Sequence, residues 1–286
     1  MSTRKIYNWQ CRDRILTLGE RTLIMGILNI TPDSFSDGGY FYDPSLAVEH
    51  ALRMEAEGAD MIDIGGESTR PGSEPVPAEE EIKRTIPVIT RIRNLSNIPI
   101  SIDTMKAEVA RAAVEAGADI INDVSALEAD NDMVNVVSET HAGVILMHMK
   151  GTPKTMQNSP AYKNVTREVQ LYLKERISFA EQRGVARDAI VIDPGIGFGK
   201  TLEHNQELLR TLPALTEFGC GLLVGASRKR MIGQILGRDN PEERLAGSLG
   251  VAAWATMQGA HILRVHDVIE TCDICRIMDT LLAGDI

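Results

Sequence analysis

The sequence is poor in aromatic residues, which make up 4% of its 286 positions. This scarcity argues against a protein that stacks nucleic-acid bases on aromatic rings, and no block of Lys and Arg supplies the basic face that such a partner needs. The formal net charge is −10, so an anionic small substrate would have to be held by local cations against an unfavourable overall field.

Long apolar runs are also missing. No stretch is long enough to cross a bilayer, and residues 1–14 contain no apolar segment of signal-peptide length. Among the four cysteines, only Cys272 and Cys275 have a spacing suited to redox or zinc chemistry. No second ligand pair lies nearby, so we interpret them as helix residues. We expect a cytoplasmic protein with neither a membrane partner nor a nucleic-acid partner.

What is present is enough apolar material for a large core. Hydrophobic residues make up 43% of the chain and charged residues 24%, which favours a single α/β domain over residues 1–286. A local pattern recurs at 57–65, 116–124 and 258–266, in which Gly-Ala ends a helical stretch and a buried strand follows. This is the αβ half of a repeated βα unit.

Eight apolar runs fit strands, near 23–29, 61–65, 98–103, 120–124, 143–148, 190–195, 222–227 and 262–267. Helix-period stretches follow nearly all of them, at 44–57, 78–93, 106–116, 132–140, 166–183, 204–212, 242–259 and 267–283. Short strands alternating with helices predict parallel pairing, and eight such units predict a closed (β/α)8 TIM barrel. Residues 5–18 predict a short β-hairpin that plugs the bottom of the barrel. The long loops at 30–43, 66–77, 149–163 and 228–241 are candidate covers over its mouth.

Several of these strands end on polar side chains, which in a parallel barrel collect at one rim. Asp193 can accept two parallel N–H donors, as offered by a guanidine-like heterocycle edge, or it can cap the next loop. Asn122 can both donate and accept, which suits a pair of ring nitrogens. Asp103 shares its strand face with Ser101 and could instead form an interstrand hydrogen bond. Asp123 points to the opposite face of its strand and favours a structural role.

Cations and an amide complete this set of candidates. Arg264 and His266 are two apart on one strand, so both can reach a diphosphate, although Arg264 could instead pair with a barrel carboxylate. Lys229 can meet a carbonyl or ring nitrogen, or can simply be solvated. Asn29 is a plausible single protein ligand for a Mg²⁺ ion whose other ligands are phosphate and water. Alternatively, its side chain caps its own turn.

A glycine-rich segment, 194–201, narrowly misses a phosphate-binding P-loop. Pro194 stands where that motif requires glycine, and proline has no amide N–H to offer to phosphate. We interpret the segment as a βα loop that places Phe198 beside the site.

Longer motifs in the right order then resemble the dihydropteroate synthase family over about residues 20–282. They are Met25–Gly39, Gly65–Gly72, Leu146–Met149, Asp193–Lys200, Ser227–Lys229 and Arg264–His266. The resemblance implies a (β/α)8 barrel, a homodimer, and the joining of p-aminobenzoate to 6-hydroxymethyl-7,8-dihydropterin diphosphate with release of pyrophosphate. It implies Mg²⁺ as the cofactor.

The resemblance also implies roles for individual residues. The pterin is held by Asp103, Asn122, Asp193 and Lys229, and Mg²⁺ and the diphosphate by Asn29, Arg264 and His266. The p-aminobenzoate side is formed by Thr69, Arg70, Pro71, Phe198 and Ser227. Asp103, Lys229, Arg264 and His266 are the expected catalytic residues. Arg230 stands where some other members carry a small hydroxyl residue, so the partner of the p-aminobenzoate carboxylate is either Arg230 or a helix N-terminus.

The chemistry suits an SN1-like loss of pyrophosphate, because a diphosphate on a carbon attached to an electron-rich pterin can leave and generate a delocalised cation. Sulfonamides, as mimics of p-aminobenzoate, should inhibit such an enzyme. Two alternatives share the pterin-binding residues: a pterin-dependent corrinoid methyltransferase and a non-catalytic pterin-binding relative.

Overall fold

A computed structural model describes residues 4–30, 44–70 and 72–283 and contains a closed parallel barrel. The strands follow one another around it in the order β10-β3-β4-β5-β6-β7-β8-β9. Their bounds are β3 Leu23–Asn29, β4 Met61–Gly65, β5 Ile100–Asp103, β6 Ile120–Asp123, β7 Gly143–Met147, β8 Ile190–Asp193, β9 Gly221–Val224 and β10 Ile262–Val265. The predicted (β/α)8 barrel is confirmed.

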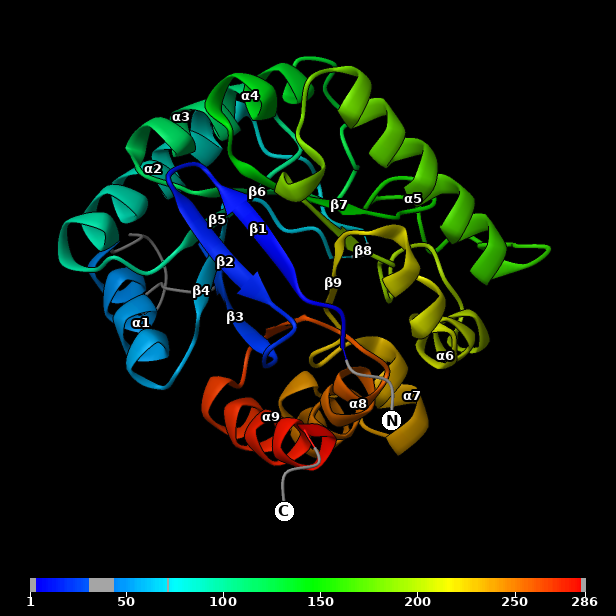
Figure 1. Ribbon diagram of the computed structural model, residues 1–286. Coiled ribbons are helices and arrows are strands. Elements are labelled where there is room, and N and C mark those ends of the chain that lie inside the picture. The colour runs from blue at the N-terminus through cyan, green and yellow to red at the C-terminus, as the bar shows by residue number, and fades with distance from the viewer. Residues whose placement is uncertain (1–3, 31–43, 71, 284–286) are drawn as a thin grey trace.

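Helices surround this barrel as an outer ring (Figure 1). Their bounds are α1 Pro44–Ala56, α2 Ala78–Leu95, α3 Ala107–Ala116, α4 Met133–Thr140, α5 Val165–Gln182, α6 Leu202–Arg210, α7 Arg230–Leu236, α8 Leu245–Met257 and α9 Val268–Ala283. The prediction of a long loop over 228–241 was wrong, because α7 occupies its middle and a 3-10 turn begins at Pro241. In the part of the chain that the structure describes, no helix is long and apolar enough to cross a membrane.

The predicted N-terminal hairpin is present as β1 Tyr7–Cys11 paired antiparallel with β2 Arg14–Leu18, and it lies across the near end of the barrel in Figure 1. Trp9, Cys11 and Leu18 pack in one buried cluster with the inward residues at the starts of the strands. A Cβ on Gly143 would lie 2.5 Å from Sγ of Cys11, and one on Gly221 would lie 2.4 Å from Cδ1 of Leu18. Glycine at these two positions therefore makes room for the plug.

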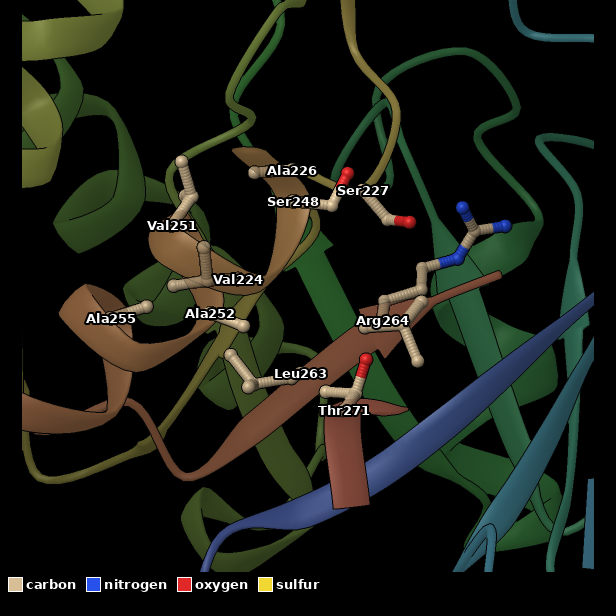
Figure 2. A pocket seen from close by; sticks show the side chains of 11 residues that line it. Val224, Ala226, Ser227, Ser248, Val251, Ala252, Ala255, Leu263, Arg264 and Thr271 are labelled. Atoms are coloured by element: carbon tan, nitrogen blue, oxygen red, sulfur yellow. The ribbon is translucent and has the colours of Figure 1, made fainter. Parts of the chain in front are cut away.

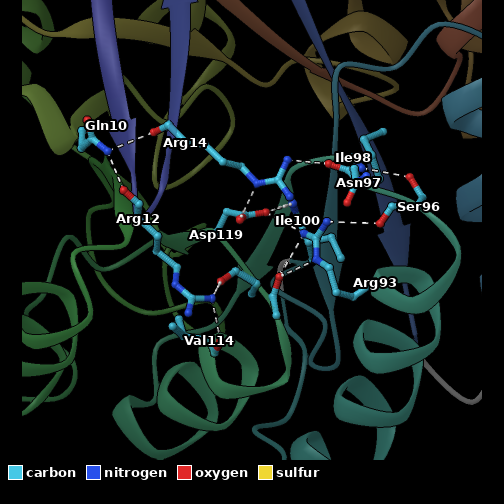
Figure 3. A network of polar contacts seen from close by, with 12 residues as sticks. Gln10, Arg12, Arg14, Arg93, Ser96, Asn97, Ile98, Ile100, Val114 and Asp119 are labelled. Atoms are coloured by element: carbon cyan, nitrogen blue, oxygen red, sulfur yellow. Dashed lines mark hydrogen bonds and ion pairs between the residues drawn. The ribbon is translucent and has the colours of Figure 1, made fainter.

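The sequence pattern at 57–65, 116–124 and 258–266 makes the same kind of hydrogen bond each time at the bottom of the barrel. Its fourth residue is Asp60, Asp119 or His261, and each side chain accepts a hydrogen bond from the backbone N–H of a neighbouring strand, at 2.8, 3.0 and 3.0 Å. Asp119 also pairs with Arg14 of the hairpin at 3.0 Å and with Arg93 of α2 at 2.7 Å (Figure 3). The pattern thus closes the bottom of the barrel and ties the hairpin to it.

Going up from this apolar plug, the inward side chains become polar. Asp63 of β4 pairs in register with Ser101 of β5, and Asp103 pairs with Asn122 of β6. All four side chains are buried. Because parallel strands place their carboxyl ends at one rim, this polar layer lies below the loops that could contact a substrate.

Candidate active site

Asp193 and Arg264 lie at the same rim of the barrel, on either side of Gly225. A Cβ on Gly225 would lie 3.6 Å from Cβ of Arg264 and 3.9 Å from Oδ2 of Asp193. Both side chains belong to strands, β8 and β10, that flank β9 in the barrel. The predicted meeting of an acid and a guanidinium at one edge is therefore observed.

Asn29 and Asp103 meet in the same way on either side of Gly65. A Cβ on Gly65 would lie 3.7 Å from Oδ1 of Asn29 and 3.9 Å from Oδ2 of Asp103. Two oxygen acceptors thus face one another over a residue without a side chain. Hard oxygen donors of this kind are what Mg²⁺ accepts alongside phosphate oxygens.

Arg264 is held by two carboxylates, as the alternative interpretation of that residue anticipated. Its Nε donates to Oδ2 of Asp63 at 2.5 Å, and its Nη2 donates to Oδ2 of Asp103 at 2.8 Å. Figure 2 shows the guanidinium extending away from the small apolar residues of α8, such as Ala252. The pairing fixes the guanidinium at the rim, where it can still meet a further anion.

Asp63 belongs to this site and was missed by the sequence reasoning. It is fully buried, and the Nδ2 of Asn122 donates to its Oδ2 at 3.1 Å. A signal was available, because Asp63, Asn122 and Arg264 occupy the same position of the recurring pattern at 57–65, 116–124 and 258–266. The structure brings these three equivalent residues into direct contact.

Among the residues that the structure describes, three buried oxygens of this layer have no hydrogen-bond partner: Oδ1 of Asp63, Oδ1 of Asp103 and Oγ of Ser101. Unsatisfied buried acceptors are costly and call for a ligand or a bound water. Burial raises the pKa of Asp103 to about 7, a shift that Arg264 opposes and Asp63 reinforces. A ligand with N–H donors would satisfy these oxygens.

Asp193 and Lys229 form a second charged pair next to the glycine-rich loop. Oδ1 of Asp193 accepts the backbone N–H of Gly195 at 2.7 Å. Burial raises the pKa of Asp193, and the charge of Lys229 opposes that shift. Burial lowers the pKa of Lys229 to about 8. The Nζ of Lys229 donates to the Ile196 carbonyl and lies 4.4 Å from the ring centroid of Phe198.

His266 and Ser227 form the outer part of the rim, with 3.0 Å between Nδ1 of His266 and Oγ of Ser227. Burial and the nearby Arg264 lower the pKa of His266 to about 3, so the imidazole is neutral at ordinary pH. The effect of Arg264 on this pKa agrees with the predicted closeness of the two residues. Their hydrogen-bond partners differ, since Arg264 binds Asp63 and Asp103 whereas His266 binds Ser227. Arg230 begins α7 and is exposed.

The loop after β4 carries Thr69, which is half-buried, and Arg70, which is exposed. Its stem is tied down because Nζ of Lys106 contacts Oε2 of Glu67 at 2.5 Å and Oε2 of the buried Glu81 at 2.6 Å. Residues 31–43 and Pro71, which were also predicted for the covers and the p-aminobenzoate side, lie outside the described residues.

The covering loops after β4 and β7 contact one another. The N–H of Gly72 donates to the Pro153 carbonyl at 3.1 Å, and Lys154 pairs with Glu74 at 2.7 Å. Two of the four predicted covers therefore lie side by side.

The structure also bears on two weaker motifs. Lys200, the lysine of the near P-loop, is buried against carbonyls of its own chain, so it does not face a phosphate site. Cys272 and Cys275 are buried free thiols on α9, as predicted for helix residues. Within residues 4–30, 44–70 and 72–283, no group of three or more His, Cys, Asp or Glu side chains could hold a metal ion.

Comparison with known proteins supports the resemblance over most of the chain. A family model described as pterin binding enzyme matches residues 25–266. Dihydropteroate synthase of Escherichia coli (strain K12) is 50% identical over 261 residues, covering 91% of this chain and 92% of that protein. Dihydropteroate synthase of Xanthomonas albilineans with 4-aminobenzoic acid superposes with a TM-score of 0.92 at 47% identity, covering 98% of this chain and 100% of that one. The Yersinia pestis enzyme in a sulfonamide drug complex gives a TM-score of 0.91 at 42% identity, with coverage of 97% and 100%.

Proposed function

The chain belongs to the dihydropteroate synthase family of pterin binding enzymes, and we propose that its barrel mouth joins p-aminobenzoate to 6-hydroxymethyl-7,8-dihydropterin diphosphate, releasing pyrophosphate. It is a transferase of folate synthesis. The observation that carries the proposal is the rim at which Asp193 and Arg264 flank Gly225. One side of this rim is suited to a fused heterocycle and the other to its phosphates.

The pterin is proposed to lie among Asp103, Asn122, Asp193 and Lys229. Asp193 has one oxygen bonded to Gly195 and a second near Gly225 that can accept from the N–H edge of the ring. Asn122 can donate and accept at adjacent ring positions. The unsatisfied Oδ1 of Asp103 is a further acceptor. Each of these groups matches a donor or acceptor that a pterin carries on its edge.

The diphosphate is proposed to bind Arg264 and His266, with Mg²⁺ held by Asn29 and the phosphate oxygens. The donor set fits a hard cation, since Oδ1 of Asn29 and a carboxylate oxygen of Asp103 face the space above Gly65. When bound, Mg²⁺ would neutralise charge on the leaving diphosphate. Arg264 contributes a fixed positive charge to the same end, because two carboxylates already orient its guanidinium.

The reaction then requires no nucleophile from the protein. Loss of pyrophosphate leaves a delocalised pterin cation, which the carboxylates of Asp103 and Asp193 stabilise, while Arg264 and the neutral His266 hold the departing phosphates. The amine of p-aminobenzoate attacks the cation to form the new C–N bond, and its nitrogen then gives up a proton to the released pyrophosphate. Water would compete with the amine, so the contacting loops after β4 and β7 have to exclude it.

The p-aminobenzoate side is proposed to comprise Thr69, Arg70 and Pro71 with Phe198 and Ser227. Phe198 is half-buried beside Lys229 and offers a flat face to an aromatic ring. Because sulfonamides mimic p-aminobenzoate, we propose that they compete for this place, as the sulfonamide complex of the Yersinia pestis relative suggests.

We further propose a homodimer built on α7, α8 and α9. The sequence of α8 is apolar on all sides, which is typical of a helix buried on every face. Yet these helices expose apolar side chains, among them Ile235, Leu236, Trp254, Met257 and Ile269. A second copy would cover them. We also propose a cytoplasmic location, in keeping with the four free thiols.

One assay distinguishes the proposed function from its two alternatives. Pyrophosphate released from the pterin diphosphate with Mg²⁺ is measured with and without p-aminobenzoate, and the pterin product is identified. We expect 7,8-dihydropteroate and equimolar pyrophosphate only when p-aminobenzoate is present. Methyl transfer from methyltetrahydrofolate without pyrophosphate would support the methyltransferase, and pterin binding without turnover would support the non-catalytic relative.

A further inference from the structure

Lys200 is a buried lysine whose Nζ is surrounded by oxygen atoms of the main chain. The residue is only 3% exposed. Its Nζ donates to the carbonyls of Gly195, Phe198 and His148 at 2.8, 2.9 and 3.2 Å. Nδ1 of His148 is a fourth neighbour at 2.9 Å. None of these four neighbours is a carboxylate, so within the described residues Nζ is held by dipoles rather than by an ion pair.

These contacts join two segments that are far apart in the sequence. Gly195 and Phe198 belong to the loop after β8, whereas His148 directly follows β7. A Cβ on Gly195 would lie only 1.9 Å from the carbonyl oxygen of His148, so the two backbones are in direct contact where Lys200 bridges them. Tyr162 adds an outer contact, since its hydroxyl donates to the Gly199 carbonyl at 2.8 Å.

The loop that Lys200 holds makes three contacts with two groups of the proposed active site, Asp193 and Lys229. The N–H of Gly195 donates to Asp193, the carbonyl of Ile196 accepts from Lys229, and Phe198 lies against the same ammonium. Within the described part of the site, Lys200 makes no hydrogen bond to a proposed ligand-binding side chain. It fixes the carbonyls on either side of Ile196 and thus the backbone that orients these groups.

The electrostatics of Lys200 also involve the site. Burial lowers the pKa of Lys200, the charge of Asp193 opposes this shift, and the charge of Lys229 adds to it. Burial lowers the pKa of His148 to about 2, so its ring is neutral, and Nδ1 lies 2.9 Å from Nζ of Lys200, where it can share one of the N–H donors with a carbonyl. Lys200 and Lys229 therefore both place Nζ against carbonyls of the 195–199 loop.

We propose that Lys200 is a positioning residue that holds the 195–199 loop against His148 and so sets the places of Asp193, Phe198 and Lys229. This inference deepens the proposed function and rests on it, because the positioned groups are those assigned to the pterin and to p-aminobenzoate. The proposal predicts that the two halves of the site differ in their dependence on Lys200. The pterin and p-aminobenzoate half depends on Lys200, whereas the diphosphate half at Arg264 and His266 does not.

The test is Lys200→Met, which keeps an unbranched chain and removes the N–H donors, with Lys83→Met on the exposed face of α2 as the matched control. Three quantities are measured with Mg²⁺ present: the Kd of 6-hydroxymethylpterin, the KM of p-aminobenzoate and the inhibition constant of pyrophosphate. We expect the first two to rise about tenfold, as for a misplacement of the groups that orient a substrate, and the third to stay unchanged.

A purely structural role would produce a different pattern. Equal weakening of pterin and pyrophosphate binding, or a lowered Tm with all three constants unchanged, would overturn the proposal. If Lys200→Met does not fold, Lys200→Gln is measured in its place. Its shorter side chain cannot reach all four acceptors, so we expect the first two constants to rise and the third to stay unchanged, and an equal change in all three, or no change, would overturn the proposal. The unaltered chain is measured first: a failure to release pyrophosphate there would count against the proposed function, and only a normal unaltered chain puts the positioning role to the test.

Discussion

Nε of Arg264, on β10, lies 2.5 Å from Oδ2 of Asp63, on β4, and β3 stands between those two strands in the barrel. Asp63 also accepts from Nδ2 of Asn122. One buried carboxylate thus orients a residue proposed for the diphosphate and a residue proposed for the pterin. Asp63 thus links the two halves of the site.

We therefore expect Asp63→Asn to impair both halves. The amide would put an N–H group against the guanidinium or remove the acceptor of Asn122, and kcat/KM for the pterin diphosphate should fall about 100-fold. Steady-state kinetics against Asp273→Asn, an exposed position on α9, checks this. Activity of Asp63→Asn equal to that of the control would show that Asp63 plays no part in orienting the site.

Lys229 should give the activity an alkaline limit. Burial lowers its pKa from 10.5 to about 8, so its positive charge is lost as the pH rises through about 8. We expect kcat/KM for the pterin diphosphate to fall over that range. Lys229→Arg should abolish the fall, at a lower plateau, because guanidinium stays charged.

The same group affects stability with the opposite sign. Between about pH 8 and 10.5 the folded chain binds fewer protons at Lys229 than the unfolded chain does, so this group makes the free energy of unfolding rise with pH. In this pH range Lys229 makes the folded chain more stable while the activity is expected to fall. A fall of that kind is therefore due to titration in the site and not to alkaline unfolding. A pH profile of kcat/KM that is identical in the parent chain and in Lys229→Arg would assign the limit to another group.

Lys106 should matter for both stability and the cover loop. It pairs with the buried Glu81 and with Glu67, whose Oε2 also accepts the N–H of Val76. Lys106→Met leaves Glu81 buried without its cation, and we expect the free energy of unfolding to fall by about 3 kcal/mol. Urea unfolding measures this loss.

A second substitution provides the control for Lys106. Adding Glu81→Gln to Lys106→Met removes the uncompensated charge and should restore part of the lost stability. The double variant should still show a raised KM for p-aminobenzoate, since the stem of the loop carrying Thr69 stays untied. A double variant as unstable as the single one would mean that the loss comes from packing rather than from charge.

The hairpin plug predicts a compensating pair at the bottom of the barrel. Gly221→Ala places a methyl group 2.4 Å from Cδ1 of Leu18, and we expect the variant to lose about 2 kcal/mol through overpacking. Combining it with Leu18→Ala removes the clash, so the double variant should be more stable than the sum of the two single losses predicts. Additive losses, measured by urea unfolding, would show that the two sites are independent.

Much of the barrel and of the candidate site could be predicted from the sequence, because most of the polar site residues stand at the ends of strands. Asp193, Asp103 and Asn29 each end a strand as the structure has it, and a parallel barrel places such ends at one rim. The eight strands and the plug at 5–18 followed from short apolar runs and alternation. The single domain over 1–286 and the roles of the site residues remain predictions.

Two features escaped the sequence for physical reasons. Asp63 lies inside a buried run, where a carboxylate is identified only through its partner, and that partner, Arg264, is about 200 residues away. The helix α7 was missed because it is short and contains Gly233, which usually weakens a helix. Here a Cβ on Gly233 would lie 2.4 Å from the Arg238 carbonyl oxygen, so glycine is needed for space.

The most direct test of the central claim is the pair of affinities that Asp193→Asn retains for 6-hydroxymethylpterin and for pyrophosphate, measured by titration calorimetry. An asparagine amide in place of one carboxylate oxygen puts a donor against the donors of the pterin edge, so we expect pterin affinity to fall on the order of 100-fold. Pyrophosphate affinity should stay within about twofold, because Arg264 and His266 are unchanged. Unaltered pterin binding, or equal loss of both ligands, would contradict the proposed rim in which acids hold the ring and cations hold the phosphates.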